Sequence, residues 1–150
     1  IYIIIWGVLP LEYGNVIRRK LVRLTEFTKE LKPLVDYTYE QYIGNYFIKR
    51  TGERLIQLIV ENMVDINSVI ISEKNLPPPK DYYSSFELLG SVNVLPPDFA
   101  DNLAPCTGMR NRLVHEYDQI DDQIIFDSIP KLLGMVDQYI AYIYEFLKSN

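Results

Sequence analysis

Apolar residues recur every three or four positions through the segment 51–72 of this sequence. Such a period is typical of an α-helix with a buried face, and a face this wide needs neighbours on more than one side. We therefore expect a helix at the centre of a helical bundle. The residues that carry the pattern are Leu55, Leu58, Ile59, Met63, Ile66 and Ile70, widened by Ile56, Val60, Val64 and Val69.

The rest of the chain indicates further helices and no convincing strand hairpin, so we predict an all-α fold, an antiparallel bundle of about five helices. Prolines at 77–79 should break the chain after the central helix. The other expected helices are Val16 to about Lys32, ended or kinked by Pro33; a short tyrosine-rich one within 34–47; 82–89, capped by Gly90; 97–115, opened by Pro97; and Asp121–Asp122 onward, kinked at Pro130.

Residues 1–15 lack a clear helical pattern. Their apolar run ends in Pro10 and Gly14, falls short of the ~20 apolar residues of a membrane span, and has no basic leader. No other stretch approaches that length either. We expect residues 1–15 to be an N-terminal extension of unknown role, strand-like or upstream of the domain proper, and residues 16–150 to form the domain. Membrane association is not expected, and the predicted location is cytoplasmic.

Composition excludes several kinds of site. With one cysteine, Cys106, and one histidine, His115, the chain has no intrachain disulfide and too few ligands for a Cys-based zinc cluster. We expect no metal. Cys106 also has no evident partner that would make it a nucleophile. The net charge of −5 argues against a strongly basic nucleic-acid coat protein, although a local basic groove is compatible with it.

The densest polar cluster lies at the expected end of a helix, in residues 110–117. It holds the only histidine, His115, together with Arg110, Asn111, Arg112 and Tyr117. Basic groups near a helix C-terminus often do no more than complement the helix dipole. Here, however, an acidic protein concentrates its phosphate-binding and proton-transfer groups in one short run. We therefore treat this cluster as the candidate site.

The spacing Arg110-x4-His115-x-Tyr117 matches the R-x4-H-x-Y signature of HEPN proteins. The chain resembles in particular the HepT-like toxins of HEPN/MNT toxin–antitoxin pairs. The resemblance covers about Val16 to Lys148. It includes the long helix around Glu53–Ser72, the proline break at 77–79, and the segments Tyr83–Gly90, Val94–Asp98 and Met109–Tyr117.

The resemblance implies a metal-independent endoribonuclease that cleaves tRNA or mRNA, in a toxin–antitoxin system of type VII. It implies a homodimer with the site at the dimer interface and with Arg110 and His115 as the catalytic pair. It further implies that an MNT-type nucleotidyltransferase antitoxin neutralises the toxin by transferring AMP from ATP to Tyr117. The toxin itself needs no cofactor.

The chemistry of these residue types agrees. RNA is cut without metal when its 2′-OH attacks the adjacent phosphate, which requires proton transfer and a cation. A histidine, with a reference pKa near 6.5, suits the first task, and the fork of donors on an arginine suits the second. Asn111 can orient the His115 ring or contact phosphate, and Arg112 is either a contact to the RNA backbone or a surface cation. AMP on Tyr117 would block RNA by bulk and like charge; otherwise Tyr117 is a core or interface phenol.

Geometry adds a constraint. Residues five apart on an ideal helix point about 140° away from each other. Either the helix ends before His115, or two protomers share a cleft and supply two histidines. The second option predicts a dimer independently of the resemblance, and the 12 tyrosines also suit sizeable interfaces.

Other interpretations stay open. A non-catalytic helical subunit could bind a nucleotidyltransferase and present substrate to it, whereas a purely structural dimerisation module leaves the polar cluster unexplained. Basic residues between Arg18 and Lys32 form either a solvated face or a stripe that leads phosphates to the site. Acidic residues within 98–127 would keep a basic site selective or face a protein partner.

Overall fold

The computed structural model describes residues 2–149, with side chains from residue 13 onward, and this part of the chain is all-α. It contains seven α-helices and two short 3₁₀ helices, more than the five or so predicted. They are α1 (Tyr2–Leu31), η1 (Lys32–Asp36), α2 (Tyr39–Gly44), α3 (Tyr46–Glu73), α4 (Tyr82–Ser91), α5 (Pro97–Leu103), α6 (Cys106–His115), η2 (Tyr117–Gln119) and α7 (Asp122–Lys148).

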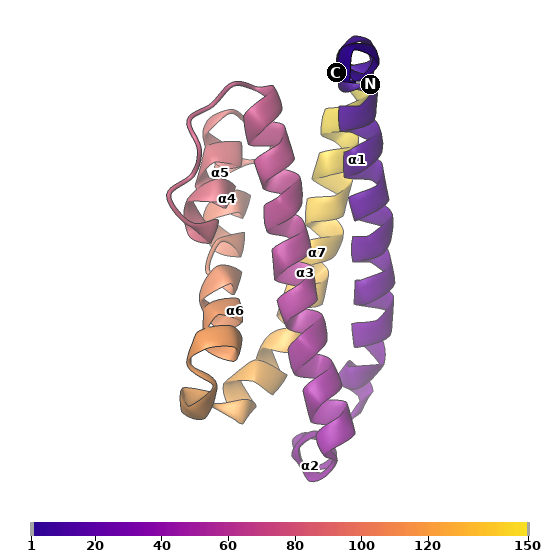
Figure 1. Ribbon diagram of the computed structural model, residues 1–150. Coiled ribbons are helices and arrows are strands. Elements are labelled where there is room, and N and C mark those ends of the chain that lie inside the picture. Colours follow the sequence, from indigo (N-terminus) through magenta and orange to yellow (C-terminus); the bar gives the residue numbers. More distant parts are fainter. Residues whose placement is uncertain (1, 150) are drawn as a thin grey trace.

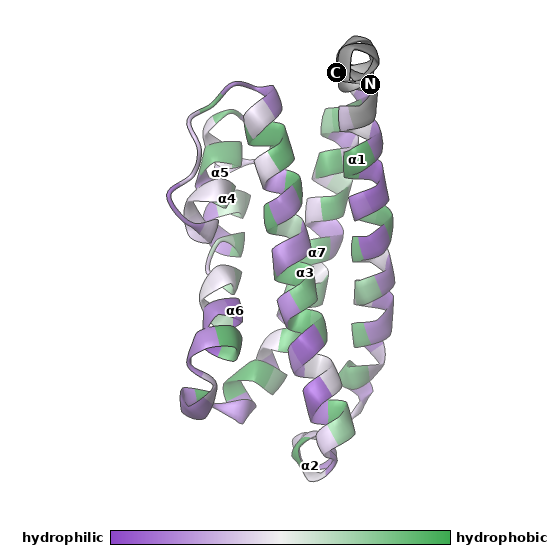
Figure 2. Ribbon diagram, in the orientation of Figure 1, coloured by the Kyte–Doolittle hydropathy of each residue, from purple (hydrophilic) through white to green (hydrophobic). Residues whose placement is uncertain are grey.

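Helix α3 lies at the centre of the bundle, as its wide apolar face predicted. Figure 1 shows α1 and α7 on one side of α3, and α4, α5 and α6 on the other side. In Figure 2, α1 carries its hydrophobic residues on the side toward α3 and its hydrophilic residues on the outer side. Ile17, Leu21 and Leu24 on that inner side are fully buried.

Helix α3 begins at Tyr46, earlier than predicted, because the Asn45 side chain caps it by accepting hydrogen bonds from the N–H groups of Phe47 and Ile48. Contrary to expectation, α3 is long and apolar enough by composition to cross a membrane, the one such helix among the described residues. Inside the bundle, 56% of its apolar window is buried, and core helices of soluble proteins pass the same test.

The strand-like interpretation of the first residues is wrong. Helix α1 starts at Tyr2 and continues through Pro10 and Gly14 to Leu31, because a short apolar run does not by itself distinguish helix from strand. No helix end marks a boundary at residue 15. The role of the extension depends on side chains 1–12, which lie outside the described residues. The predicted stop at Pro33 is confirmed, since α1 ends at Leu31 and Pro33 opens η1.

The predicted helix 97–115 is in fact two helices. It is interrupted at Ala104 and Pro105, because proline lacks the N–H that would bond one turn back. Gly90 is not a cap but lies inside α4, where a Cβ would come within 2.9 Å of the Ala100 Cβ. The glycine therefore allows α4 and α5 to pack closely. The turn after α4 instead uses Asn93, at φ 60°.

Helix α7 begins after Asp121, whose side chain accepts from the N–H groups of Gln123 and Ile124, and it contains Pro130. Figure 1 shows its first turns slanting across the end of the bundle before the rest runs beside α1. The buried Tyr139 hydroxyl donates to Asn67 Oδ1 at 2.6 Å, and the Asn67 amide donates to Ser85 Oγ at 3.0 Å. This network joins α7, α3 and α4.

Candidate functional site

The predicted site residues lie between the middle of helix α6 and the short η2 helix that follows it. Helix α6 packs against α3 and α4 and buries Thr107 and Leu113. It ends at His115, where the Glu116 N–H bonds the Arg112 carbonyl, and Tyr117 follows in η2. The cluster seen in the sequence is therefore a compact structural unit at one end of the bundle.

Arg110 is held in a defined position by two residues of other helices. Its Nε and Nη2 donate to the same Glu61 oxygen, at 2.8 and 2.7 Å, and its guanidinium lies 4.9 Å from the centre of the Tyr82 ring. Its Nη1 donates to Asn111 Oδ1 at 3.2 Å. Three of the five N–H groups are thus engaged and two are not, on a side chain that is 14% exposed. The sequence indicated Arg110 but neither Glu61 nor Tyr82.

Glu61 belongs to a polar stripe on helix α3. Glu53, Gln57 and Glu61 follow at intervals of four, which places them on the side of α3 that meets the α6 end, and Gln57 donates to Glu61 at 3.1 Å. Burial opposes ionisation of Glu61, but the hydrogen bonds from Arg110 and Gln57 keep the pKa of its carboxyl below its ordinary value. In the sequence, polar residues at intervals of four within an apolar pattern could have indicated that this side of the helix faces a polar site.

His115 points elsewhere than Arg110. It is exposed at the last position of α6, and in the described part of the chain no side chain hydrogen-bonds its ring. Because α6 stays helical through His115, the first option for bringing the pair together, an earlier helix end, is excluded. A single chain therefore does not direct Arg110 and His115 at one point. The Asn111 amide oxygen accepts from Arg110 and not from His115, and the roles expected for Asn111, orienting the His115 ring or contacting phosphate, stay predictions.

Tyr117 contacts the beginning of α3. Its hydroxyl donates to Glu53 Oε1 at 2.8 Å and accepts from Arg50 Nη1, while the Arg50 guanidinium lies 5.2 Å from its ring centre. The phenol is 41% exposed, so it is neither a core residue nor bonded to a backbone carbonyl. Partial burial and the Glu53 carboxylate raise the pKa of Tyr117. Arg50 and Glu53 were not predicted from the sequence.

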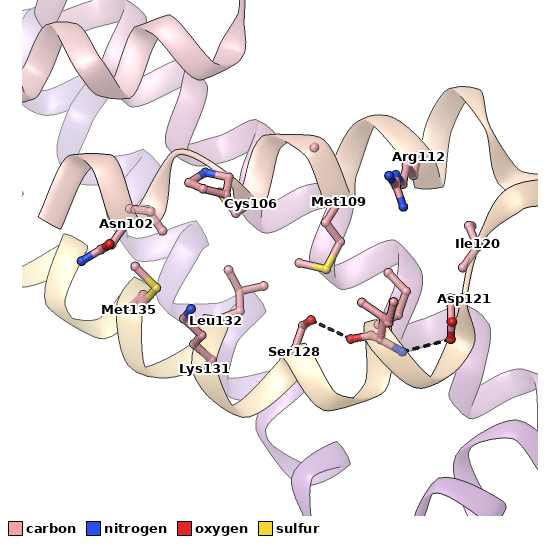
Figure 3. Close-up of a pocket in the computed structure, with 15 residues that line it drawn as sticks. Asn102, Cys106, Met109, Arg112, Ile120, Asp121, Ser128, Lys131, Leu132 and Met135 are labelled. Atoms are coloured by element: carbon pink, nitrogen blue, oxygen red, sulfur yellow. Dashed lines mark hydrogen bonds between the residues drawn. The ribbon is translucent and has the colours of Figure 1, made fainter. Parts of the chain in front are cut away.

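An apolar groove of about 370 Å³ runs between α6 and the start of α7. In Figure 3, Met109 on one side and Leu132 and Met135 on the other point into it, and Arg112 lies beside it. Cys106 also lines the groove, and burial raises the pKa of its thiol to about 12, which agrees with its exclusion as a nucleophile.

Two other sequence features lie outside this site. The basic residues of α1 are mostly exposed, and α1 lies across α3 from α6, so the predicted stripe does not lead to the α6 end within one chain (Figure 1). Lys20 of this stripe pairs with Asp65 at 3.5 Å. Among the described residues, no group of histidine, cysteine and acidic side chains is arranged to hold a metal ion.

Comparisons with known proteins identify the family of this chain. A family model described as "Ribonuclease HepT-like" matches residues 20–143. The tRNA nuclease HepT of Aphanizomenon flos-aquae is 32% identical over 132 residues, covering 88% of this chain and 90% of that protein. The mRNA nuclease HepT of Shewanella oneidensis is 30% identical over 88 residues, covering 59% of this chain and 66% of that protein.

A solved structure shows the same fold. The tri-AMPylated HEPN toxin of Shewanella oneidensis, in complex with its MNT antitoxin, superposes with a TM-score of 0.79 at 24% identity, covering 87% of this chain and 97% of that one. The family match and the level of identity confirm the resemblance found in the sequence. The chain belongs to the HepT-like ribonuclease family.

Proposed function

We propose that this protein cleaves RNA without a metal ion, using Arg110 and His115. The observation that carries the proposal is the position of Arg110. Glu61 and Tyr82 fix its guanidinium, and its two unengaged N–H groups are proposed to bind phosphate oxygens. His115 at the exposed end of the same helix supplies an imidazole for proton transfer.

In the proposed reaction the 2′-OH of one nucleotide attacks the adjacent phosphorus. His115 accepts the 2′-OH proton, and a second histidine donates a proton to the departing 5′-oxygen. Arg110 stabilises the extra negative charge on the phosphorane-like transition state. Arg112, exposed one turn before His115, binds the RNA backbone electrostatically. The products are a 2′,3′-cyclic phosphate and a 5′-hydroxyl.

The second histidine comes from a second copy of the chain in this proposal. One protomer leaves Arg110 and His115 on different sides of α6, so its site is incomplete. The groove between α6 and α7 is apolar, and Ile124 beside it is 58% exposed. A second copy packed on this groove buries Ile124 and brings the two α6 ends together, because Arg112 lies at the groove and His115 is one turn away.

Control of this activity is proposed to occur at Tyr117. An MNT-type nucleotidyltransferase transfers AMP from ATP to its hydroxyl, as the AMPylated Shewanella toxin complex suggests by analogy. The added phosphate and base lie beside the α6 end and exclude RNA. The two nuclease relatives support tRNA or mRNA as the substrate, and we place the reaction in the cytoplasm, where both are found.

The test is cleavage of a mixed tRNA and mRNA pool by the purified protein in excess chelator. The wild type should cut, and Arg110→Ala and His115→Ala should each lose activity by about 100-fold or more. Asp65→Asn, an exposed change on α3 away from α6, serves as the matched control and should cut like the wild type. RNA left intact by a folded wild type, with a stable nucleotidyltransferase complex, would instead favour the non-catalytic subunit.

A further inference from the structure

Glu53 is a carboxylate that the packing of α3 does not require. Its side chain is only 7% exposed, and its helix neighbours Leu55 and Ile56 belong to the hydrophobic core. Burying a carboxylate costs free energy unless it is paired. Here Oε1 takes both partners, Arg50 at 3.1 Å and the Tyr117 hydroxyl at 2.8 Å, while buried Oε2 has none in the described part of the chain.

Tyr117 is also distinct from the other tyrosines. Among those at positions 13–149, it is the one whose hydroxyl hydrogen-bonds a carboxylate. Tyr139 instead bonds an amide and a carbonyl oxygen inside the core, and the buried hydroxyls of Tyr13 and Tyr42 have no partner. Tyr117 therefore combines an accessible ring with a hydroxyl that already points its proton at an acid–base group.

We propose that Glu53 is the general base for AMP transfer to Tyr117, so that the toxin carries the base for its own modification. The inference rests on the proposed function, in which Tyr117 accepts AMP. The Tyr117 oxygen forms a bond to the α-phosphorus of ATP as its proton passes to Glu53. The bond between that phosphorus and the bridging oxygen breaks, and pyrophosphate leaves with the electron pair.

Arg50 completes the arrangement. Its side chain is 55% exposed, its Nη1 contacts both the Tyr117 hydroxyl and Glu53, and its guanidinium stacks on the Tyr117 ring. It is therefore placed to hold the α-phosphate of an incoming nucleotide against the phenol oxygen. After transfer, the same guanidinium pairs with the phosphodiester that joins AMP to Tyr117.

The experiment measures AMP incorporation from α-labelled ATP into the purified full chain by its MNT-type nucleotidyltransferase, with peptide mapping of Tyr117. Glu53→Gln keeps the shape and an acceptor but removes the base. We expect its kcat to fall by about 100-fold or more, with KM for ATP unchanged because the partner binds ATP. Glu53→Asp should recover part of the rate, and Asp65→Asn on the same helix should match the wild type.

Each outcome decides the inference. A loss in kcat for folded Glu53→Gln, with partial recovery in Glu53→Asp, supports it. If folded Glu53→Gln is labelled at Tyr117 as fast as the wild type, the role of Glu53 is overturned while AMP transfer to Tyr117 stands. The base then belongs to the nucleotidyltransferase. A wild-type chain that is never labelled at Tyr117 overturns the proposed AMP transfer, and the inference with it. If Glu53→Gln does not fold, Glu53→Ala with added formate decides, since formate can replace the missing carboxylate as a base and a rate that formate does not raise refutes a base at this position.

Discussion

Replacing Glu61 with glutamine removes the charge that holds Arg110 but keeps the shape of the side chain. Two N–H groups of Arg110 now donate to one ionised oxygen, at 2.8 and 2.7 Å. Hydrogen bonds to charged groups contribute roughly 1.5–3 kcal/mol each. Because the Glu61 side chain is 29% exposed, water compensates for part of the loss. We expect Glu61→Gln to lower the free energy of unfolding by about 1–2 kcal/mol.

The effect on RNA cleavage should be larger than the effect on folding. With a neutral amide oxygen in place of the carboxylate, the acceptor for Arg110 is weaker, and the guanidinium depends more on Tyr82 and Asn111 for its position. A misplacement of about 1 Å costs on the order of 100-fold in rate. We therefore expect kcat for cleavage of a defined RNA to fall about 10–100-fold, with the oligomeric state unchanged.

The pH dependence of stability distinguishes the loss of the Glu61 charge from a general packing defect. The folded-state pKa of Glu61 lies below its ordinary value of 4.5, so its contribution to stability is present above that value. It is lost as the pH falls through the lowered pKa. In urea titrations the wild type should exceed Glu61→Gln by a constant amount near neutrality, and the difference should disappear on acidification. Equal cleavage rates, or a difference in stability that persists in acid, would refute the proposed role of Glu61.

Four further substitutions test the fold and the proposed dimer. Gly90→Ala should lower the free energy of unfolding, measured in urea, by about 1–3 kcal/mol, because its Cβ would meet the Ala100 Cβ at 2.9 Å. Gly134→Ala, which has open space around it in α7, should raise that free energy by about 0.5–1 kcal/mol. A stabilising Gly90→Ala and a destabilising Gly134→Ala would contradict the packing. Tyr139→Phe should cost about 1–3 kcal/mol by leaving a buried amide oxygen unpaired, and no loss would contradict that bond. Ile124→Asp should give a folded monomer without nuclease activity in sedimentation and cleavage assays, and an active dimer would exclude the groove as the interface.

Local rules predicted much of the helical pattern. The wide apolar period of 51–72 placed α3 at the centre, and Pro33 and Asp121 mark the ends they were expected to mark. The wrong predictions of helix ends concern residue types that occur in two structural roles. Gly90 ends helices in many proteins, but here it allows the close approach of α4 and α5. Pro97 begins a helix, and Pro105, eight residues later, begins the next one.

The site was predictable only in part because its residues are brought together by packing. The motif indicated Arg110, His115 and Tyr117 from their spacing within one helix and its exit. Their partners Glu61 and Glu53 come from α3, 49 and 64 residues away in sequence from the residues they bind. Only the arrangement of α3 beside α6 shows that the acidic positions of α3 meet the basic end of α6.

In the proposed mechanism, Arg110 and His115 cleave RNA by attack of its own 2′-OH, without metal. The most direct measurement is mass spectrometry of the 3′ ends produced by the wild-type protein in excess chelator, with His115→Ala in parallel. We expect 2′,3′-cyclic phosphate ends from the wild type and none above background from His115→Ala. Ends carrying a 3′-hydroxyl, or cleavage that persists unchanged in His115→Ala, would contradict it.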